Sequence, residues 1–353
     1  MKNIIKTLVV MLSSVSLFAT ANAGSLDVSG TAKATYNITS GQSNAGKGIG
    51  ITNELNFTAA GELDNGYTWS YSMELDPADG SAGGAATNDD TQLTVSTPMG
   101  TLGVFVLEGG LDLEDGASQS VYARPTDIGD PSSTTDNFTI DSYNNIQYHT
   151  PADMLPFGIT AKIAYATDLD GTNNSGNAAG ATNAVAIEGA GESATEYQVK
   201  ASPIDGLTIG ASYMNFDGEG NATKAQEAEG GAYMATYASG PFSIGYSKAY
   251  KAPLVGSTVA ANITETVEYY DQTNMSVAYA ASDDLSISYE KETSEANYVL
   301  NTTADVEQAS KAVQVAYTMG GMTLALSHGS YDNNGYVDAA NADQTLIAVT
   351  MAF

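Results

Sequence analysis

The chain has 353 residues, of which 12 are Lys or Arg and 41 are Asp or Glu, so its formal charge at pH 7 is -29. We expect no nucleic-acid partner, because nucleic-acid phosphates attract basic proteins. The absence of Cys excludes disulfides and thiolate metal sites. Because 42% of the residues are hydrophobic and fall in alternating runs, the composition also argues against a disordered chain.

Residues 1–23 have the pattern of an export signal. Lys2 and Lys6 precede a short apolar stretch, and residues 21–23 read Ala-Asn-Ala, a small-x-small cleavage site. A membrane anchor is the alternative, but the stretch is shorter than the ~20 apolar residues that a spanning helix needs. We expect cleavage before Gly24. Removal of two Lys and no acid changes the charge from -29 to -31 over the remaining 330 residues (353 minus 23).

Apolar and polar residues alternate along the rest of the chain. In residues 67–75 one parity reads Tyr, Trp, Tyr, Met, Leu, and the other reads Thr, Ser, Ser, Glu. The pattern returns at residues 207–213, 242–247, 285–290 and 313–318, and period-two alternation indicates half-buried β-strands. No later apolar run has the length of a spanning helix. A chain that spans a membrane without one needs a closed barrel, because unpaired backbone groups cannot lie in hydrocarbon.

Short turns alternate with long polar connections, which is typical of membrane barrels. Turn sequences occur at residues 62–66, 98–100, 151–158, 202–206, 240–241, 282–284 and 320–321. Seven turns, and a length of roughly 20 residues per strand with its connection, both predict about sixteen strands. We therefore expect residues 24–353 to form one all-β domain, a transmembrane antiparallel β-barrel with long outer loops. A two-sheet sandwich, the alternative, would need large apolar side chains on the inward parity.

The last strand ends on an aromatic residue. Val349, Met351 and Phe353 share one parity, with Phe353 last. This ending resembles the signal that the bacterial barrel-assembly machinery recognises, so we expect these three residues to form an assembly signal. Closure of a barrel further predicts that this strand pairs with residues 26–38.

A long acidic segment separates two strand-like segments, residues 101–108 and 143–151. Around it the chain resembles the general trimeric porins of Gram-negative bacteria. In that family a Gly-Thr-Leu strand, here at residues 100–102, leads into the third outer loop, and an Asn-x-Ile-x-Tyr-x-x-Pro strand, here at residues 144–151, follows it. The resemblance implies a homotrimer of 16-stranded barrels in which the third loop, residues 109–142, folds inward and constricts a water-filled pore.

The acids of this segment are the candidate pore residues. An ordinary surface loop is the alternative. We expect an acidic constriction formed first by Asp112, Glu114 and Asp115 and then by Asp127 and Asp130. We expect Glu54, Glu74, Lys33, Lys162, Lys200 and Arg124, the only Arg, along the lumen wall. The family has a basic cluster opposite the loop, whereas the inward positions between residues 52 and 96 carry no Arg or Lys.

These features predict an outer-membrane channel for passive diffusion of small hydrophilic solutes. We expect it to prefer cations, because acids in a narrow passage concentrate counter-ions. The alternatives are a substrate-selective channel and a mainly structural or surface-interaction barrel. Lipid and lipopolysaccharide are the expected surroundings.

The sequence gives little support for catalysis or for a dedicated metal site. His149 and His328 are the only histidines, and nothing in the sequence brings either one together with a nucleophile and a carboxylate, so we expect no enzyme activity. Residues 168–174 and 217–221 cluster oxygen ligands that suit Ca²⁺ or Mg²⁺, but neither stretch has the full EF-hand spacing. We expect no cofactor beyond such weak binding on acidic loops.

Overall fold

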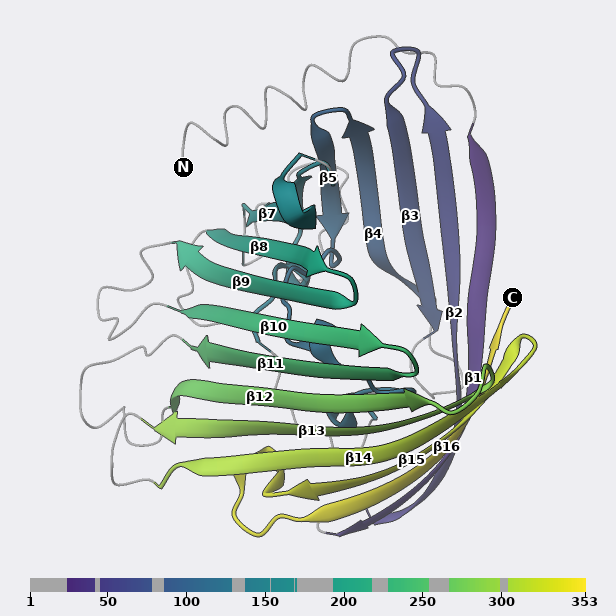
Figure 1. Ribbon diagram of the computed structural model, residues 1–353, viewed down its shortest axis with the longest axis vertical. Coiled ribbons are helices and arrows are strands. Elements are labelled where there is room, and N and C mark those ends of the chain that lie inside the picture. Colours follow the sequence, from purple (N-terminus) through teal and green to yellow (C-terminus); the bar gives the residue numbers. More distant parts are fainter. Residues whose placement is uncertain are drawn as a thin grey trace.

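The computed structural model describes residues 24–41, 45–77, 86–128, 137–152, 154–167, 169, 193–217, 228–253, 267–298 and 304–353. Its sixteen strands form a closed antiparallel barrel, in which each strand pairs with its neighbours in the chain and β1 pairs with β16 (Figure 1). The predicted sixteen-stranded antiparallel β-barrel is thus confirmed. Among the described residues, no helix has the length and apolar character to cross a membrane.

The strands are β1 (Ser25–Gly41), β2 (Gly46–Glu62), β3 (Thr68–Pro77), β4 (Ala86–Thr97), β5 (Gly100–Val106), β6 (Asn145–His149), β7 (Thr160–Ala166), β8 (Ser193–Ile204), β9 (Leu207–Asp217), β10 (Glu229–Ser239), β11 (Phe242–Ala252), β12 (Val267–Ala280), β13 (Leu285–Tyr298), β14 (Val306–Met319), β15 (Met322–Asp332) and β16 (Ala342–Ala352). The seven connections that leave even-numbered strands lie at or beside the seven predicted turns. Two-residue turns use Gly206 (φ 76°) and Gly320 (φ 61°), because glycine adopts positive φ without steric cost.

The outward parity of the strands is apolar, as the alternation predicts. On β11, Phe242, Ile244 and Tyr246 are exposed, whereas Gly245 and Ser247 on the other parity are buried. A barrel in hydrocarbon needs such an arrangement, with apolar side chains outside and polar ones inside.

The barrel closes between the two ends of the described chain. The β1–β16 register runs from Thr31 opposite Ala352 to Gly41 opposite Ala342, so the last strand pairs with β1 as predicted, although with residues 31–41 instead of 26–38. The Gly30 N–H donates to the Phe353 carbonyl (2.9 Å), and the Phe353 N–H donates to the Gly30 carbonyl (3.0 Å). A Cβ on Gly30 would lie 2.9 Å from Phe353 Cζ, so the missing side chain makes room for the Phe353 ring.

Candidate functional site: a loop folded into the barrel

The segment between β5 and β6, residues 107–144 and here named the inner loop, turns into the barrel. Its described residues, 107–128 and 137–144, contain three short 3-10 helices, η1 (Asp115–Ala117), η2 (Pro125–Asp127) and η3 (Ile140–Ser142). The first contacts β10, β11 and β12, the second contacts β13 and β14, and the third contacts β7 and β8. These helices of the inner loop therefore lie against the inside of the wall between β7 and β14.

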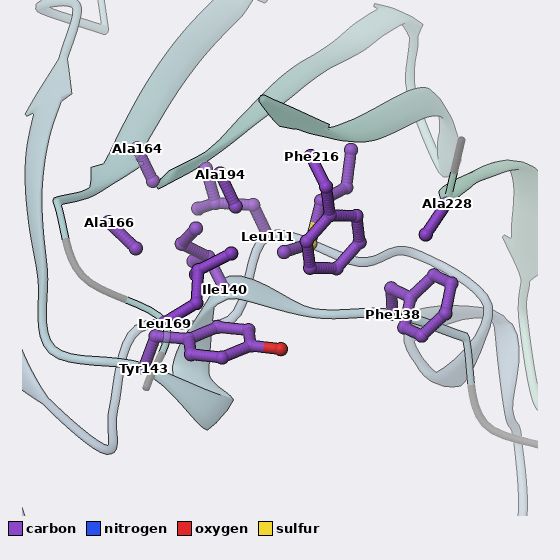
Figure 2. Packing of buried hydrophobic residues seen from close by; sticks show 11 residues of the cluster. Leu111, Phe138, Ile140, Tyr143, Ala164, Ala166, Leu169, Ala194, Phe216 and Ala228 are labelled. Carbon is purple, nitrogen blue, oxygen red and sulfur yellow. The ribbon is translucent and has the colours of Figure 1, made fainter. Parts of the chain in front are cut away.

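The base of the inner loop lies in a hydrophobic core inside the barrel, shown in Figure 2. The Phe138 ring meets the Phe216 ring of β9 edge-on at a centroid distance of 5.0 Å, and Tyr143 contacts the same ring at 6.3 Å. The cluster comprises Leu111, Phe138, Ile140, Tyr143, Ala164, Ala166, Leu169, Ala194, Met214, Phe216 and Ala228. Burial of one large apolar side chain is worth about 1.5–3 kcal/mol, so this core fixes the base of the loop.

Two smaller apolar clusters fix the rest of the inner loop. One comprises Leu113 and Ala117 of the loop with Ala232, Met234 and Ala249 of the wall. The other comprises Ile128 of the loop with Ala312, Ala325, Leu346 and Ala348. Because the wall residues lie on the inward parity, the barrel offers apolar contacts to the loop on five further strands.

Inward polar side chains of the wall bind the backbone of the inner loop. Gln198 of β8 donates to the Leu111 carbonyl (2.7 Å), and Ser276 of β12 donates to the Ala117 carbonyl (3.0 Å). Further such bonds join Ser247 to the Glu114 carbonyl (3.0 Å), the Val121 N–H to Ser288 (3.0 Å), Gln314 to the Ala123 carbonyl (2.6 Å) and Tyr331 to the Pro125 carbonyl (2.9 Å). The polar inner face of these strands thus satisfies the loop backbone, which burial inside the barrel would otherwise leave unpaired.

Glycines on the inward parity allow this close approach. A Cβ on Gly245 of β11 would lie 1.7 Å from the Ala117 carbonyl oxygen, and one on Gly210 of β9 would lie 2.7 Å from Leu113 Cδ1. Such distances are not possible between real atoms, so any side chain at Gly245 would displace η1.

Arg124 binds three carboxylates. Its guanidinium pairs with Asp115, with Asp127 at 2.8 Å and with Glu292 of β13 at 3.5 Å. Burial alone would lower the pKa of Arg124, but the neighbouring Asp115, Asp127 and Glu292 outweigh burial and raise this pKa. Arg124, which the sequence predicts along the lumen, belongs to the inner loop and is buried, with 8% of its surface exposed.

The predicted constriction acids separate into two groups. Asp115 and Asp127 have side chains that are 46% and 47% exposed, and Asp112 is half-buried. Glu114 is buried and accepts hydrogen bonds from the Leu113 N–H (3.3 Å) and the Asn137 N–H (2.9 Å), so it braces the loop. Asp130 lies outside the described residues. Carboxylate oxygens of Asp112, Glu114 and Asp115 lie within 4.8 Å of one another.

Asp141 is a further acid of the site that the sequence did not single out. A Cβ on Gly110 would lie 2.7 Å from Asp141 Oδ2 and 3.0 Å from Asp112 Oδ1, so these two carboxylates flank the same glycine. Burial, and then repulsion from Asp112, raise the pKa of Asp141 to about 6. In the sequence, the one indication that Asp141 belongs to the site was its position near the C-terminal end of the predicted loop.

The wall opposite the inner loop is more open to solvent. Lys33 of β1 and Glu54 of β2 are only half-buried, and the Lys33 ammonium lies 6.0 Å from the centroid of the Tyr122 ring in the loop. Thr31 donates to the Glu54 carboxylate (3.4 Å). Glu74 of β3 is half-buried as well. The open part of the lumen therefore lies between the inner loop and β1–β4.

Lys162 and Lys200 lie on inward positions of adjacent strands, β7 and β8. Lys162 is opposite His149 in the register, and Lys200 is opposite Thr160, close to the short-turn end of both strands. Both side chains are half-buried. These two bases are therefore set apart from Lys33 along the wall.

Sequence reasoning missed the residues that hold the inner loop. Met214 and Phe216 are apolar residues on the otherwise polar parity of β9, and Glu290 and Glu292 are neighbouring acids on the inward parity of β13. Apolar residues on a lumen parity indicate that something packs against that wall, and this signal could have predicted where the loop docks.

The comparisons with known proteins agree with this architecture. A family model described as Gram-negative porin matches residues 7–353. No curated protein sequence matches the chain. Similar solved structures include OmpF of Salmonella typhi in complex with daunomycin, with 12% identity, a TM-score of 0.65 and coverage of 94% of this chain and 98% of the other. In-vitro folded OmpT, an outer membrane protein of Vibrio cholerae, has 14% identity, a TM-score of 0.61 and coverage of 94% and 98%.

A variant of the Rh. blastica porin is also similar, with 14% identity, a TM-score of 0.58 and coverage of 93% of this chain and 100% of the other. At such identities the likeness concerns the fold. The family match extends over nearly the whole sequence and agrees with the sixteen-stranded barrel. The chain belongs to the Gram-negative porin family.

Proposed function

We propose that this porin, a channel across the outer membrane, is a passive diffusion pathway for small hydrophilic solutes and prefers cations. One observation carries the preference. The carboxylates of Asp115 and Asp127 are exposed and Asp112 is half-buried, whereas Lys33 is the one base among the described inward side chains of β1–β4. Counter-ions concentrate in a passage lined by charge of one sign, and ions of that sign are excluded.

The close spacing of the acids strengthens this electrostatic argument. At 4.8 Å and an effective dielectric of 20, two carboxylates repel each other by roughly 3 kcal/mol before screening by salt. A permeating cation relieves this repulsion, whereas an anion adds to it. Arg124 offsets part of the charge of Asp115 and Asp127, and Asp141, whose pKa is about 6, is mostly ionised at pH 7.

A reversal potential measured across a planar bilayer under a KCl gradient tests the preference. We expect the sign of the wild-type potential to show that K⁺ permeates more readily than Cl⁻. The double variant Asp112→Asn with Asp115→Asn should lower the K⁺ to Cl⁻ permeability ratio by about twofold. Asp283→Asn, in the exposed turn between β12 and β13, is the matched control and should leave the ratio unchanged. Anion preference of the wild type would contradict the proposal.

Solute uptake into liposomes distinguishes diffusion from the two alternative functions. Sugars and amino acids of graded size should enter at rates that fall smoothly with size. One strongly favoured solute would indicate a substrate-selective channel, and the absence of flux would indicate a structural or surface-interaction barrel.

A homotrimer is the proposed assembly. The outer face of β1 and β2 exposes Leu26, Val28, Ile49 and Ile51, and Ile49 is 87% exposed. One of the similar structures, OmpT of Vibrio cholerae with 15% identity, is described as a trimer form. A strongly apolar wall segment of this kind suits contact with a second copy. Removal of residues 1–23 on export, recognition of Val349, Met351 and Phe353 by the assembly machinery and contact with lipopolysaccharide remain proposals from the sequence.

A further inference from the structure

A small cavity lies behind the inner loop, on the side of the loop away from the open lumen. Its volume is about 20 Å³, which is enough for one water-sized sphere. Glu114 and Arg124 of the loop line it, together with inward side chains of β11, β12 and β13. The wall side chains are Ser247, Gln272, Asn274 and Glu292, and Ala249, Thr273 and Thr293 complete the lining.

Two amide oxygens of the cavity wall have no hydrogen-bond partner within the described part of the chain. They are Gln272 Oε1 and Asn274 Oδ1, on side chains that are 6% and 5% exposed. The amide nitrogen of Asn274 donates to Glu290 and to Glu292 (3.4 Å), which fixes the amide orientation and leaves its oxygen without a partner. A buried acceptor without a partner lowers the stability of the fold by about 1–3 kcal/mol. A ligand that binds oxygen atoms would remove this cost.

The charge around the cavity selects among such ligands. Glu114 and Glu292 line it, Glu290 is hydrogen-bonded to Asn274, and Arg124 is the one base among the described lining residues. Arg124 is shared with Asp115 and Asp127, so negative charge remains in excess. A water molecule could donate to both amide oxygens but would leave that charge uncompensated. A cation would bind the oxygens and compensate the charge together.

We propose that this cavity binds one hard cation, Ca²⁺, through oxygens of Glu114, Gln272, Asn274 and Glu292. Carboxylate and amide oxygens are Ca²⁺ ligands, and Ca²⁺ accepts irregular geometry, whereas Mg²⁺ requires a near-ideal octahedron and gives up water reluctantly. The ion would connect the inner loop to β12 and β13 and so hold the loop against the wall. This site shares Glu114 with the carboxylate group of Asp112, Glu114 and Asp115, but that group contains no residue of the wall.

Crystals of the full mature barrel, purified free of lipopolysaccharide and soaked with Tb³⁺ as a Ca²⁺ substitute, test the location directly. The expected result is an anomalous peak at a coordination distance, about 2.3–2.6 Å, from both amide oxygens of Gln272 and Asn274. A peak confined to Asp112 and Asp115, or a cavity that keeps only water, would overturn the proposal. This test does not depend on ion selectivity, so it can fail while the proposed channel function stands.

Variants then test the ligands in solution, with ⁴⁵Ca²⁺ binding measured by equilibrium dialysis. Gln272→Met keeps the length of the side chain and removes one ligand, so Ca²⁺ affinity should fall at least about tenfold. Asp283→Asn removes an acid of the exposed turn between β12 and β13 and should change this affinity by less than about twofold. Unchanged affinity in Gln272→Met would overturn the proposal. If Gln272→Met does not fold, the crystallographic test still decides.

Discussion

Arg124 is the residue on which the inner loop most depends electrostatically. Its fork-shaped guanidinium joins η1, η2 and the wall strand β13, because Asp115, Asp127 and Glu292 belong to these three elements. A guanidinium can bind several carboxylates at once in a fixed geometry, which an ammonium cannot do as well. The only Arg of the chain therefore acts as a tie between the loop and the barrel.

Arg124→Met should loosen the inner loop. The substitution leaves Glu292 buried without its cation, and breaking a buried ion pair in this way costs about 3–5 kcal/mol. We expect the barrel to unfold at a lower temperature in detergent, measured by its shift in electrophoretic mobility on heating. Arg124→Lys, which keeps the charge but loses the fork, should give an intermediate value. An unchanged unfolding temperature for Arg124→Met would contradict the claim that Arg124 joins the inner loop to the barrel.

Asp141 should make the channel sensitive to pH. Its pKa of about 6 in the folded barrel exceeds the ordinary Asp value of about 3.9, so the folded state binds the proton more tightly than the unfolded chain. The stability from protonated Asp141 is complete below pH ~4 and is lost as the pH rises through ~6. Over the same rise the inner loop gains one negative charge.

The reversal potential should therefore show stronger cation preference at pH 7 than at pH 5, with a midpoint near the pKa of Asp141, about 6. Asp141→Asn should remove this step near pH 6. If the step persisted in the variant, another group would be responsible for it.

At the scale of elements, the inner loop and the strands behind it form one packed unit. Glycine at position 245 lets the Ala117 carbonyl lie against β11, and Ser276 of β12 donates to the same oxygen. The loop position is thus set by contact with the backbone of the wall as well as by side chains.

Gly245→Ala should push η1 away from β11 and toward the open lumen. Overpacking of this kind costs about 1–3 kcal/mol, and the displaced loop should narrow the passage. We expect a lower single-channel conductance in a planar bilayer. Gly48→Ala, which also adds a methyl group to an inward position but meets nothing within 4 Å, is the matched control. Equal conductance in the two variants would show that the loop does not rest on Gly245.

The strands were predictable from the sequence and the loop contacts were not, for a physical reason. Hydrocarbon imposes apolar residues on one parity of every strand, so Tyr67 to Leu75 carries its own structural signal. Whether Glu114 or Arg124 faces water depends on how the inner loop folds, and the pattern along the chain does not encode this. The pairing of Arg124 with Glu292 joins residues 168 positions apart (292 minus 124), which only the closed barrel brings together.

At the scale of the whole molecule, barrel closure depends on the contact between Gly30 and Phe353. Their backbones exchange two hydrogen bonds, and the Phe353 ring occupies the space that a side chain at Gly30 would take. The same glycine also faces Glu54, since an added Cβ would lie 2.5 Å from its carbonyl oxygen. The seam of the barrel is therefore tightly packed at this position.

Gly30→Ala should weaken this seam. Because the added methyl group meets both β2 and Phe353, we expect a loss of about 1–3 kcal/mol and a lower yield of heat-resistant barrel on refolding into detergent micelles. Gly321→Ala, in the turn before β15 and with its nearest neighbour at 3.8 Å, should refold like the wild type. Equal yields for both variants would mean that the seam tolerates the methyl group.

The inner loop covers only part of the inner wall, and this affects which substitutions the porin can tolerate. Side chains such as Gln198, Ser276 and Gln314 hold the loop, so substitutions there disturb the packed unit before they alter the pore. Lys33, Glu54 and Glu74 face the open lumen from strands that the inner loop leaves half-exposed. Variation in selectivity should accordingly accumulate on β1–β4, where a charge can be gained or lost without loss of the fold, while β8–β16 stay constant inside.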